Sequence, residues 1–93
     1  MAKVFLDGLL VAHSAAHRAL VDLHLETHIA LTRAEPGCLK FEITPDPSDS
    51  NKWHVSEIFE SEEAFEIHQA RARASEWGQV SEPLERRFKK RVE

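Results

Sequence analysis

Hydrophobic residues repeat with two different periods along the chain, and the changes of period mark the expected elements. Residues 4–11 are mostly apolar and rich in β-formers, which is typical of a central strand covered on both faces. In residues 39–44 and 52–60 apolar and polar positions alternate, which predicts two half-buried antiparallel strands joined by a loop over 45–51. A weaker alternation over 88–93 predicts a short final strand.

Two other segments carry apolar residues at helical spacing. The first runs from Ser14, a good N-cap residue, to about Ala34. The second is expected to begin at the cap residue Ser61 and to weaken around residues 75–78. The apolar stripe of the first helix, which we expect to face the core, consists of Ala16, Leu20, Leu23, Thr27, Ala30, Leu31 and Ala34.

Pro36 and Gly37 stand where the helical period gives way to alternation. Pro36 has no backbone donor and disfavours a helical conformation in the residue before it, so the first helix should end here. Gly37 can adopt a positive φ and turn the chain into the next strand. The apolar residues expected on one face of that strand are Leu39, Phe41 and Ile43.

The resulting order, β-α-β followed by β-α-β, predicts a ferredoxin-like α+β fold, βαββαβ, with an antiparallel sheet and both helices on one face. The length of 93 residues predicts one domain spanning 1–93. The other face of the sheet is too apolar to remain in water, so we expect two copies to pack sheet against sheet in a two-fold homodimer.

Composition excludes several classes of function. The net charge of −4 argues against a nucleic-acid partner. A single cysteine, Cys38, rules out an intrachain disulfide and any multi-cysteine metal site. No apolar run approaches membrane-spanning length and no secretory signal pattern is present, so we expect a cytoplasmic protein with no membrane partner. With three glycines, no flavin, nicotinamide or phosphate-binding loop can be built.

Two segments stand out as motifs, residues 35–43 (EPGCLKFEI) and residues 56–65 (SEIFESEEAF), the second followed by His68. Together they resemble motifs of the antibiotic biosynthesis monooxygenase family. The resemblance extends over about residues 3–92. It implies a dimeric α+β barrel built on the ferredoxin-like fold. Family members include cofactor-independent quinol-type monooxygenases, haem-degrading enzymes and an isomerase of a signalling sugar phosphate.

The chain departs from the family pattern at several positions. Some relatives have Tyr at the position of Ser56 and Tyr or Trp at that of Phe59, whereas this chain contains no tyrosine. Many relatives also have a second His, in a Pro-His pair, where this chain has residues 71–73 (RAR). The haem-degrading branch uses an Asn, a Trp and a His. Asp7 and His68 stand near the Asn and Trp positions, so the sequence argues against haem degradation.

His68 is the leading candidate for a catalytic group, because it lies on the apolar face of the second helix and titrates near neutral pH. The alternative is a structural histidine at the edge of the core. Glu57 shares a strand face with apolar residues, where a carboxylate is costly unless it is paired. It either forms an ion pair with Arg71 or Arg73, or acts as a base or as the group that orients His68. His28, nearest the Pro-Gly turn, is the other candidate for orienting His68.

Aromatic residues are expected to form the walls of a substrate pocket beneath the helices. Asp7 is included because a carboxylate in a mostly apolar strand can face a pocket, although it can also be a charge at the strand end. The expected pocket residues are Asp7, Phe41, Phe59, Phe65 and Trp77.

A row of histidines follows one side of the first helix, at His13, His17, His24 and His28. Pairs of histidines four residues apart can share one metal ion on a helix face. No further ligands converge on them in the sequence, so we expect a solvated helix flank and no metal site.

The resemblance favours a cofactor-independent monooxygenase acting on a quinol-like or aromatic small molecule, with His68 as base or donor and no cofactor. Two other functions stay open. One is a non-catalytic dimeric protein that binds a small ligand, which the absence of tyrosine favours. The other is an isomerase of a small phosphorylated metabolite, in which Arg71 and Arg73 would hold the phosphate.

Overall fold

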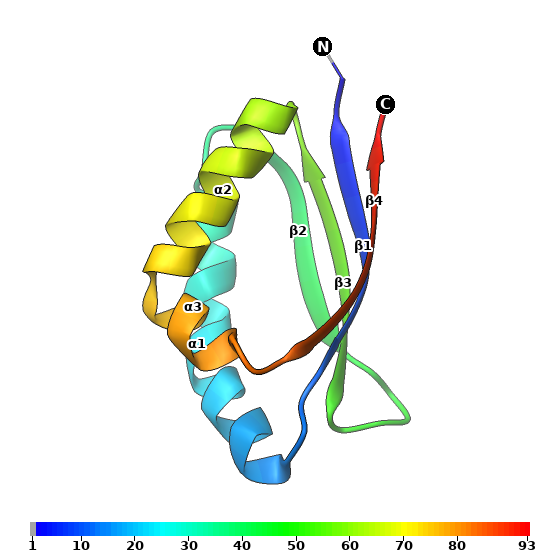
Figure 1. Ribbon diagram of the computed structural model, residues 1–93, viewed down its shortest axis with the longest axis vertical. Coiled ribbons are helices and arrows are strands. Elements are labelled where there is room, and N and C mark those ends of the chain that lie inside the picture. Colours follow the sequence, from blue (N-terminus) through cyan, green and yellow to red (C-terminus); the bar gives the residue numbers. More distant parts are fainter. Residues whose placement is uncertain (1) are drawn as a thin grey trace.

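In the computed structural model, which describes residues 2–93, a four-stranded antiparallel sheet is covered on one face by helices (Figure 1). The strands are β1 (Val4–Val11), β2 (Cys38–Pro45), β3 (Lys52–Phe59) and β4 (Glu85–Val92). The helices are α1 (Ala15–Arg33), α2 (Glu62–Ala74) and α3 (Glu76–Ser81). This order and layering confirm the predicted ferredoxin-like α+β fold.

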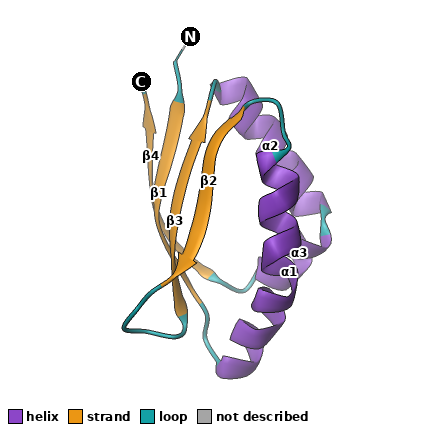
Figure 2. Ribbon diagram, turned by 180° about the vertical axis from the view of Figure 1, so that it is seen from behind, coloured by secondary structure: helices purple, strands orange, loops and turns teal. Residues whose placement is uncertain are grey.

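The sheet has the strand order β2-β3-β1-β4, and each neighbouring pair is antiparallel. β1 and β3 are therefore the central strands. Glu57 of β3 lies opposite Leu6 of β1 on one side and Phe41 of β2 on the other, so it is in the middle of the sheet. The two ends of the chain lie side by side at one end of the sheet (Figure 2), where the Glu93 N–H donates to the carbonyl of Lys3 at 2.9 Å.

The core lies between the sheet and the helices, because buried residues alternate with more exposed ones along β1, β2 and β3. Each large apolar side chain that is fully buried contributes roughly 1.5–3 kcal/mol to folding. No helix within residues 2–93 is long and apolar enough to cross a membrane. Buried apolar residues of the core include Val4, Leu6, Leu10, Val21, Phe41, Ile43, Trp53, Val55, Phe59, Phe65 and Leu84.

The face of α1 that packs against the sheet is not the predicted apolar stripe. All seven positions of that stripe are exposed, Leu23 by 77%. The buried positions of α1 are Val21, His28 and Thr32. Thr32 can take this face because its hydroxyl donates to the His28 carbonyl at 2.8 Å. In the row of histidines that was expected to be a solvated flank, His28 is buried and His17 and His24 are half-buried, whereas His13 is exposed.

Serine residues cap the helices. The hydroxyl groups of Ser14 and Ser61 accept hydrogen bonds from the backbone N–H groups of His17 and Ala64, both at 3.1 Å. They cap α1 and α2 as predicted. The weakening of the helical pattern after α2 corresponds to a real break, at which Ser75 ends α2 and caps the short helix α3.

Gly37 makes the turn after α1 without a positive φ, which among the described residues occurs only at Gly8. Gly37 is instead required by lack of space. A Cβ atom built on it would lie 2.4 Å from the Cβ of Ala64 in α2, so any side chain would push the turn away from that helix.

β2 and β4 also differ in detail from the prediction. A bulge between Cys38 and Lys40 shifts the register of β2, so Leu39 is 52% exposed and does not share the inward face of Phe41. β4 begins at Glu85, earlier than predicted. The prediction missed its first half because these residues of an edge strand are mostly charged and show no hydrophobic alternation.

Candidate functional site

A cavity of about 440 Å³ lies between the inner face of the sheet and the helices. This volume falls within the range of about 300–1,000 Å³ that is usual for small-molecule sites. Apolar side chains of the strands form much of the wall, and three buried titratable residues reach it, His28, Glu57 and His68. The charged residues Arg73 and Arg86 also line it and are exposed.

His68 is held in place by Glu35, which follows α1. The Nδ1 atom of His68 lies 2.7 Å from Oε1 of Glu35, and the His68 side chain is 3% exposed. Arg71 supports the same carboxylate, because its Nη2 donates to Thr32 Oγ1 at 3.0 Å and to Glu35 Oε1 at 3.4 Å. With Nδ1–H donated to a carboxylate, Nε2 is the nitrogen that remains able to accept a proton.

Burial lowers the pKa of His68, and the hydrogen bond to Glu35 opposes that shift. Arg71 also lowers the pKa of His68 through its positive charge. The imidazole is therefore neutral at neutral pH, with its lone pair on Nε2. A neutral imidazole backed by a carboxylate is the usual arrangement of a general base.

His28 lies flat against Trp77, with ring centroids 4.5 Å apart and an interplanar angle of 6°. Burial lowers the pKa of His28 to about 3, and the charges of His68 and Arg71 act in the same direction. Its Nδ1 atom is buried and has no hydrogen-bond partner among residues 2–93. His28 is thus a neutral, partly unsatisfied polar group in the cavity wall.

Glu57 is 7% exposed, and its Oε1 atom has no hydrogen-bond partner in the described part of the chain. Burial raises the pKa of Glu57 to about 8, with smaller contributions from the charges of Glu35 and Asp7. Arg71, one of the two arginines expected to pair with it, contacts Glu35 instead. The carboxyl group is therefore protonated at neutral pH.

The predicted aromatic residues divide between the cavity wall and the layer beneath it. Phe41 and Trp77 line the cavity. Phe59 and Phe65 do not, but the Phe59 ring lies 4.8 Å from the His68 ring and 5.7 Å from the Phe65 ring, measured between centroids. They pack beneath His68 and restrict its orientation.

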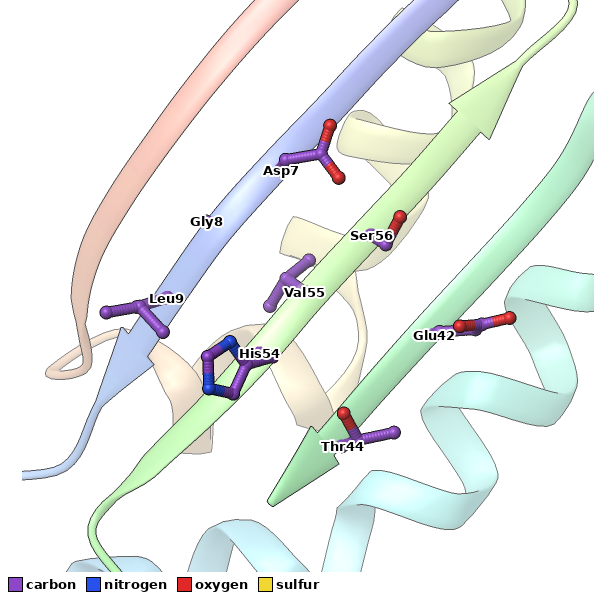
Figure 3. Close-up of a pocket in the computed structure, with 8 residues that line it drawn as sticks. All are labelled: Asp7, Gly8, Leu9, Glu42, Thr44, His54, Val55 and Ser56. Atoms are coloured by element: carbon purple, nitrogen blue, oxygen red, sulfur yellow. The ribbon is translucent and has the colours of Figure 1, made fainter. Parts of the chain in front are cut away.

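Asp7 lies on the opposite face of the sheet, and the structure does not bring it together with His68. It follows the inward-facing Leu6, so the alternation of the strand turns its side chain outward. There it lines an open concavity of about 470 Å³ together with His54 and Ser56 of β3, which Figure 3 shows at close range. Figure 3 also draws Glu42 and Thr44 of β2, which complete this outer surface.

The histidines of α1 contact separate neighbours. His17 Nε2 lies 2.8 Å from the carbonyl of Val80, and His24 Nδ1 lies 3.5 Å from the carboxylate of Glu76. His17, His24 and His28 therefore contact α3, so the expectation of a solvated flank was wrong for these three, whereas His13 is exposed. Within residues 2–93 no group of three or more His, Cys, Asp or Glu side chains is arranged to hold a metal ion.

Glu35 is the residue that sequence reasoning missed. Glu57 and His28 were considered as the groups that orient His68, whereas the observed partner is 33 residues away in sequence. The one signal in the sequence was that the family-like motif begins at Glu35. Its contact with α2 depends on how the turn after α1 folds back, which no local pattern specifies.

The fold places the chain among the small ferredoxin-like α+β proteins, and its cavity lies under the helices. The family model described as antibiotic biosynthesis monooxygenase matches residues 9–80. The chain therefore belongs to the antibiotic biosynthesis monooxygenase family. No curated protein sequence matches the chain significantly.

Solved structures share this fold at low sequence identity. A conserved protein of unknown function from Bacteroides thetaiotaomicron is 15% identical, with a TM-score of 0.75 over 99% of this chain and 96% of that chain. A protein from Pseudomonas aeruginosa is 22% identical, with a TM-score of 0.72 over 100% and 93%. SnoaB from Streptomyces nogalater, described as a cofactor-independent oxygenase, is 13% identical, with a TM-score of 0.72 over 99% and 90%.

Proposed function

We propose that the protein is a cofactor-independent monooxygenase that acts on a quinol-like or aromatic small molecule. The observation that carries this proposal is the neutral His68, held by Glu35 at 2.7 Å beside a cavity of about 440 Å³ that is partly lined by apolar strand residues. Membership of the antibiotic biosynthesis monooxygenase family supports it, as does the fold shared with an oxygenase described as cofactor-independent.

In this reaction His68 removes a proton from a phenolic hydroxyl of the substrate. The resulting anion is electron-rich and reduces dioxygen, so the substrate supplies all the electrons. One oxygen atom enters the ring and the other leaves as water, and a quinol is thereby converted into a hydroxyquinone. Glu35 stabilises the imidazolium that forms on His68, while Phe41 and Trp77 pack against the ring and exclude water.

The same proposal includes a homodimer formed through the outer face of the sheet. Phe5, Leu9 and Ile58 are half-buried residues of β1 and β3. They are placed on this outer face by the alternation that turns their neighbours inward. Pairing two such faces would remove these apolar side chains from water without covering the helices.

Dioxygen consumption with a panel of naphthoquinols, corrected for reaction without protein, tests the catalytic proposal. We expect His68→Ala to lower kcat by at least about a hundredfold, because a positioned base contributes roughly 10²–10⁴-fold. The matched control is His13→Ala, which removes an exposed histidine that does not line the cavity. Absence of turnover by the wild-type protein, or full activity of His68→Ala, would refute the proposal.

The alternative of a non-catalytic binding protein keeps one specific observation in its favour, the absence of tyrosine from the chain. It predicts that aromatic ligands raise the thermal stability of the protein without any product being formed. Thermal shift and product analysis on the same samples separate the two functions.

A further inference from the structure

Glu57 is a buried acidic group of the cavity that the reaction described above does not use. It stands on the inner face of β3, between the buried apolar residues Val55 and Phe59, and it lines the cavity. Its Oε1 atom is buried and has no hydrogen-bond partner among residues 2–93. A buried polar atom without a partner destabilises the fold, so a bound molecule that supplies a partner would recover that cost.

The groups around Glu57 do not favour a negative charge on it. The ion pairs found within residues 2–93 leave it out, and Arg71 pairs with Glu35. Titratable and charged residues that share its cavity or act on it come from every neighbouring element. They are His28 of α1, Glu35 and Cys38 of the turn and β2, Asp7 of β1, His68 and Arg73 of α2, Glu82 after α3 and Arg86 of β4.

Two of these neighbours are buried imidazoles whose pKa values are lowered, so they are neutral above pH 7 and supply no positive charge. Burial together with the carboxylates of Glu35 and Asp7 raises the pKa of Glu57 to about 8. At neutral pH the side chain is therefore an un-ionised carboxylic acid, which has an O–H donor that a carboxylate lacks.

We propose that Glu57 recognises the ligand of this cavity, as an uncharged carboxylic acid whose O–H donates a hydrogen bond to a carbonyl-type oxygen of an aromatic molecule. The ligand class is an aromatic ketone or quinone, or the oxygen that becomes one during oxidation. The inference rests on the proposed function in placing the substrate in this cavity, but recognition of the oxygen requires no turnover.

Binding of 1-tetralone tests the inference. This aromatic ketone is uncharged at all working pH values and is not a quinol, so its affinity reports the protonation of the protein alone. Quenching of tryptophan fluorescence measures the dissociation constant, since Trp77 lines the cavity. We expect the affinity of the wild-type protein to fall about tenfold between pH 6.5 and pH 9.5, as Glu57 loses the proton it donates.

Two variants separate the donor from other effects of pH. Glu57→Gln keeps an N–H donor at every pH, so its affinity should stay constant within about twofold. Glu57→Leu has no donor and should bind about tenfold more weakly at pH 6.5. Cys38→Ser is the control for the neighbouring thiol, and it should retain the pH dependence of the wild-type protein.

An affinity of the wild-type protein that is constant from pH 6.5 to pH 9.5, or no detectable binding of 1-tetralone, would overturn the inference. The comparison with Glu57→Gln decides it even if Glu57→Leu does not fold. Binding with the expected pH dependence but without quinol turnover would refute the proposed monooxygenase and leave this inference standing. Turnover together with pH-independent ketone binding would support the monooxygenase and refute the role of Glu57.

Discussion

At the scale of single residues, the buried side chain of Glu57 lowers the stability of the folded protein at neutral pH. The strand face formed by Trp53, Val55 and Phe59 would be fully apolar without it. Burial keeps the carboxyl group protonated in the folded state, while in the unfolded chain it ionises at its ordinary pKa near 4.5. The unfolded state is thus favoured progressively as the pH rises between these two values.

Replacing Glu57 with Gln should therefore stabilise the protein by an amount that grows with pH. The folded pKa of about 8 lies above the unfolded value of 4.5, so wild-type stability falls across this window at up to about 1.4 kcal/mol per pH unit. Above pH 8 both states are ionised and the difference levels off. Urea unfolding of both proteins at pH 5, 6.5 and 8 measures it, and equal slopes against pH would contradict a buried acid at this position.

At the scale of elements, much of the fold followed from local rules. Pro36 ended α1, Ser14 and Ser61 capped their helices, and strict alternation placed β3 correctly. The inward face of α1 did not follow, because buried His28 and Thr32 are polar and hydrophobic periodicity does not count them. The Glu35–His68 contact was equally hidden, since it joins two elements whose relative position only the folded chain determines.

The reassigned face of α1 gives a matched pair of substitutions. Val21 is 0% exposed, so Val21→Ala should destabilise the protein by about 2 kcal/mol through lost burial and a small cavity. Leu23 is 77% exposed, so Leu23→Ala should change stability by less than about 0.5 kcal/mol. Chemical denaturation of both variants measures these losses of stability. A larger loss for Leu23→Ala than for Val21→Ala would show that the leucine stripe faces the core.

At the scale of the whole molecule, two apolar surfaces are candidates for the interface of the proposed dimer. One is the outer face of the sheet, with Phe5, Leu9 and Ile58, and the other is the exposed stripe of α1 that includes Leu23. The outer sheet face includes the concavity near Asp7 and Ser56 (Figure 3) and extends over β1 and β3. The stripe, in contrast, follows a single helix. A large interface between two copies therefore fits the sheet better than the helix.

Charge placed on each surface in turn tests this choice. Leu9→Asp should shift the protein from a dimer towards the 10.6 kDa monomer in sedimentation velocity, because pairing would bury an unpaired carboxylate. Leu23→Asp should leave the dimer intact. Dissociation by Leu23→Asp alone would assign the interface to α1, and a wild-type monomer would remove the dimer from the proposal.

The pairing of Lys3 with Glu93 has a consequence for how the chain can be rearranged. Because the start of β1 lies beside the end of β4, a short peptide can join the two ends of the chain without disturbing the sheet. New ends can then be opened in the β2–β3 loop, where the Asp46 carboxylate holds the backbone N–H groups of Ser48 and Asp49. A chain with the strands in this new order should therefore build the same sheet, and it should keep the cavity that contains His28 and His68.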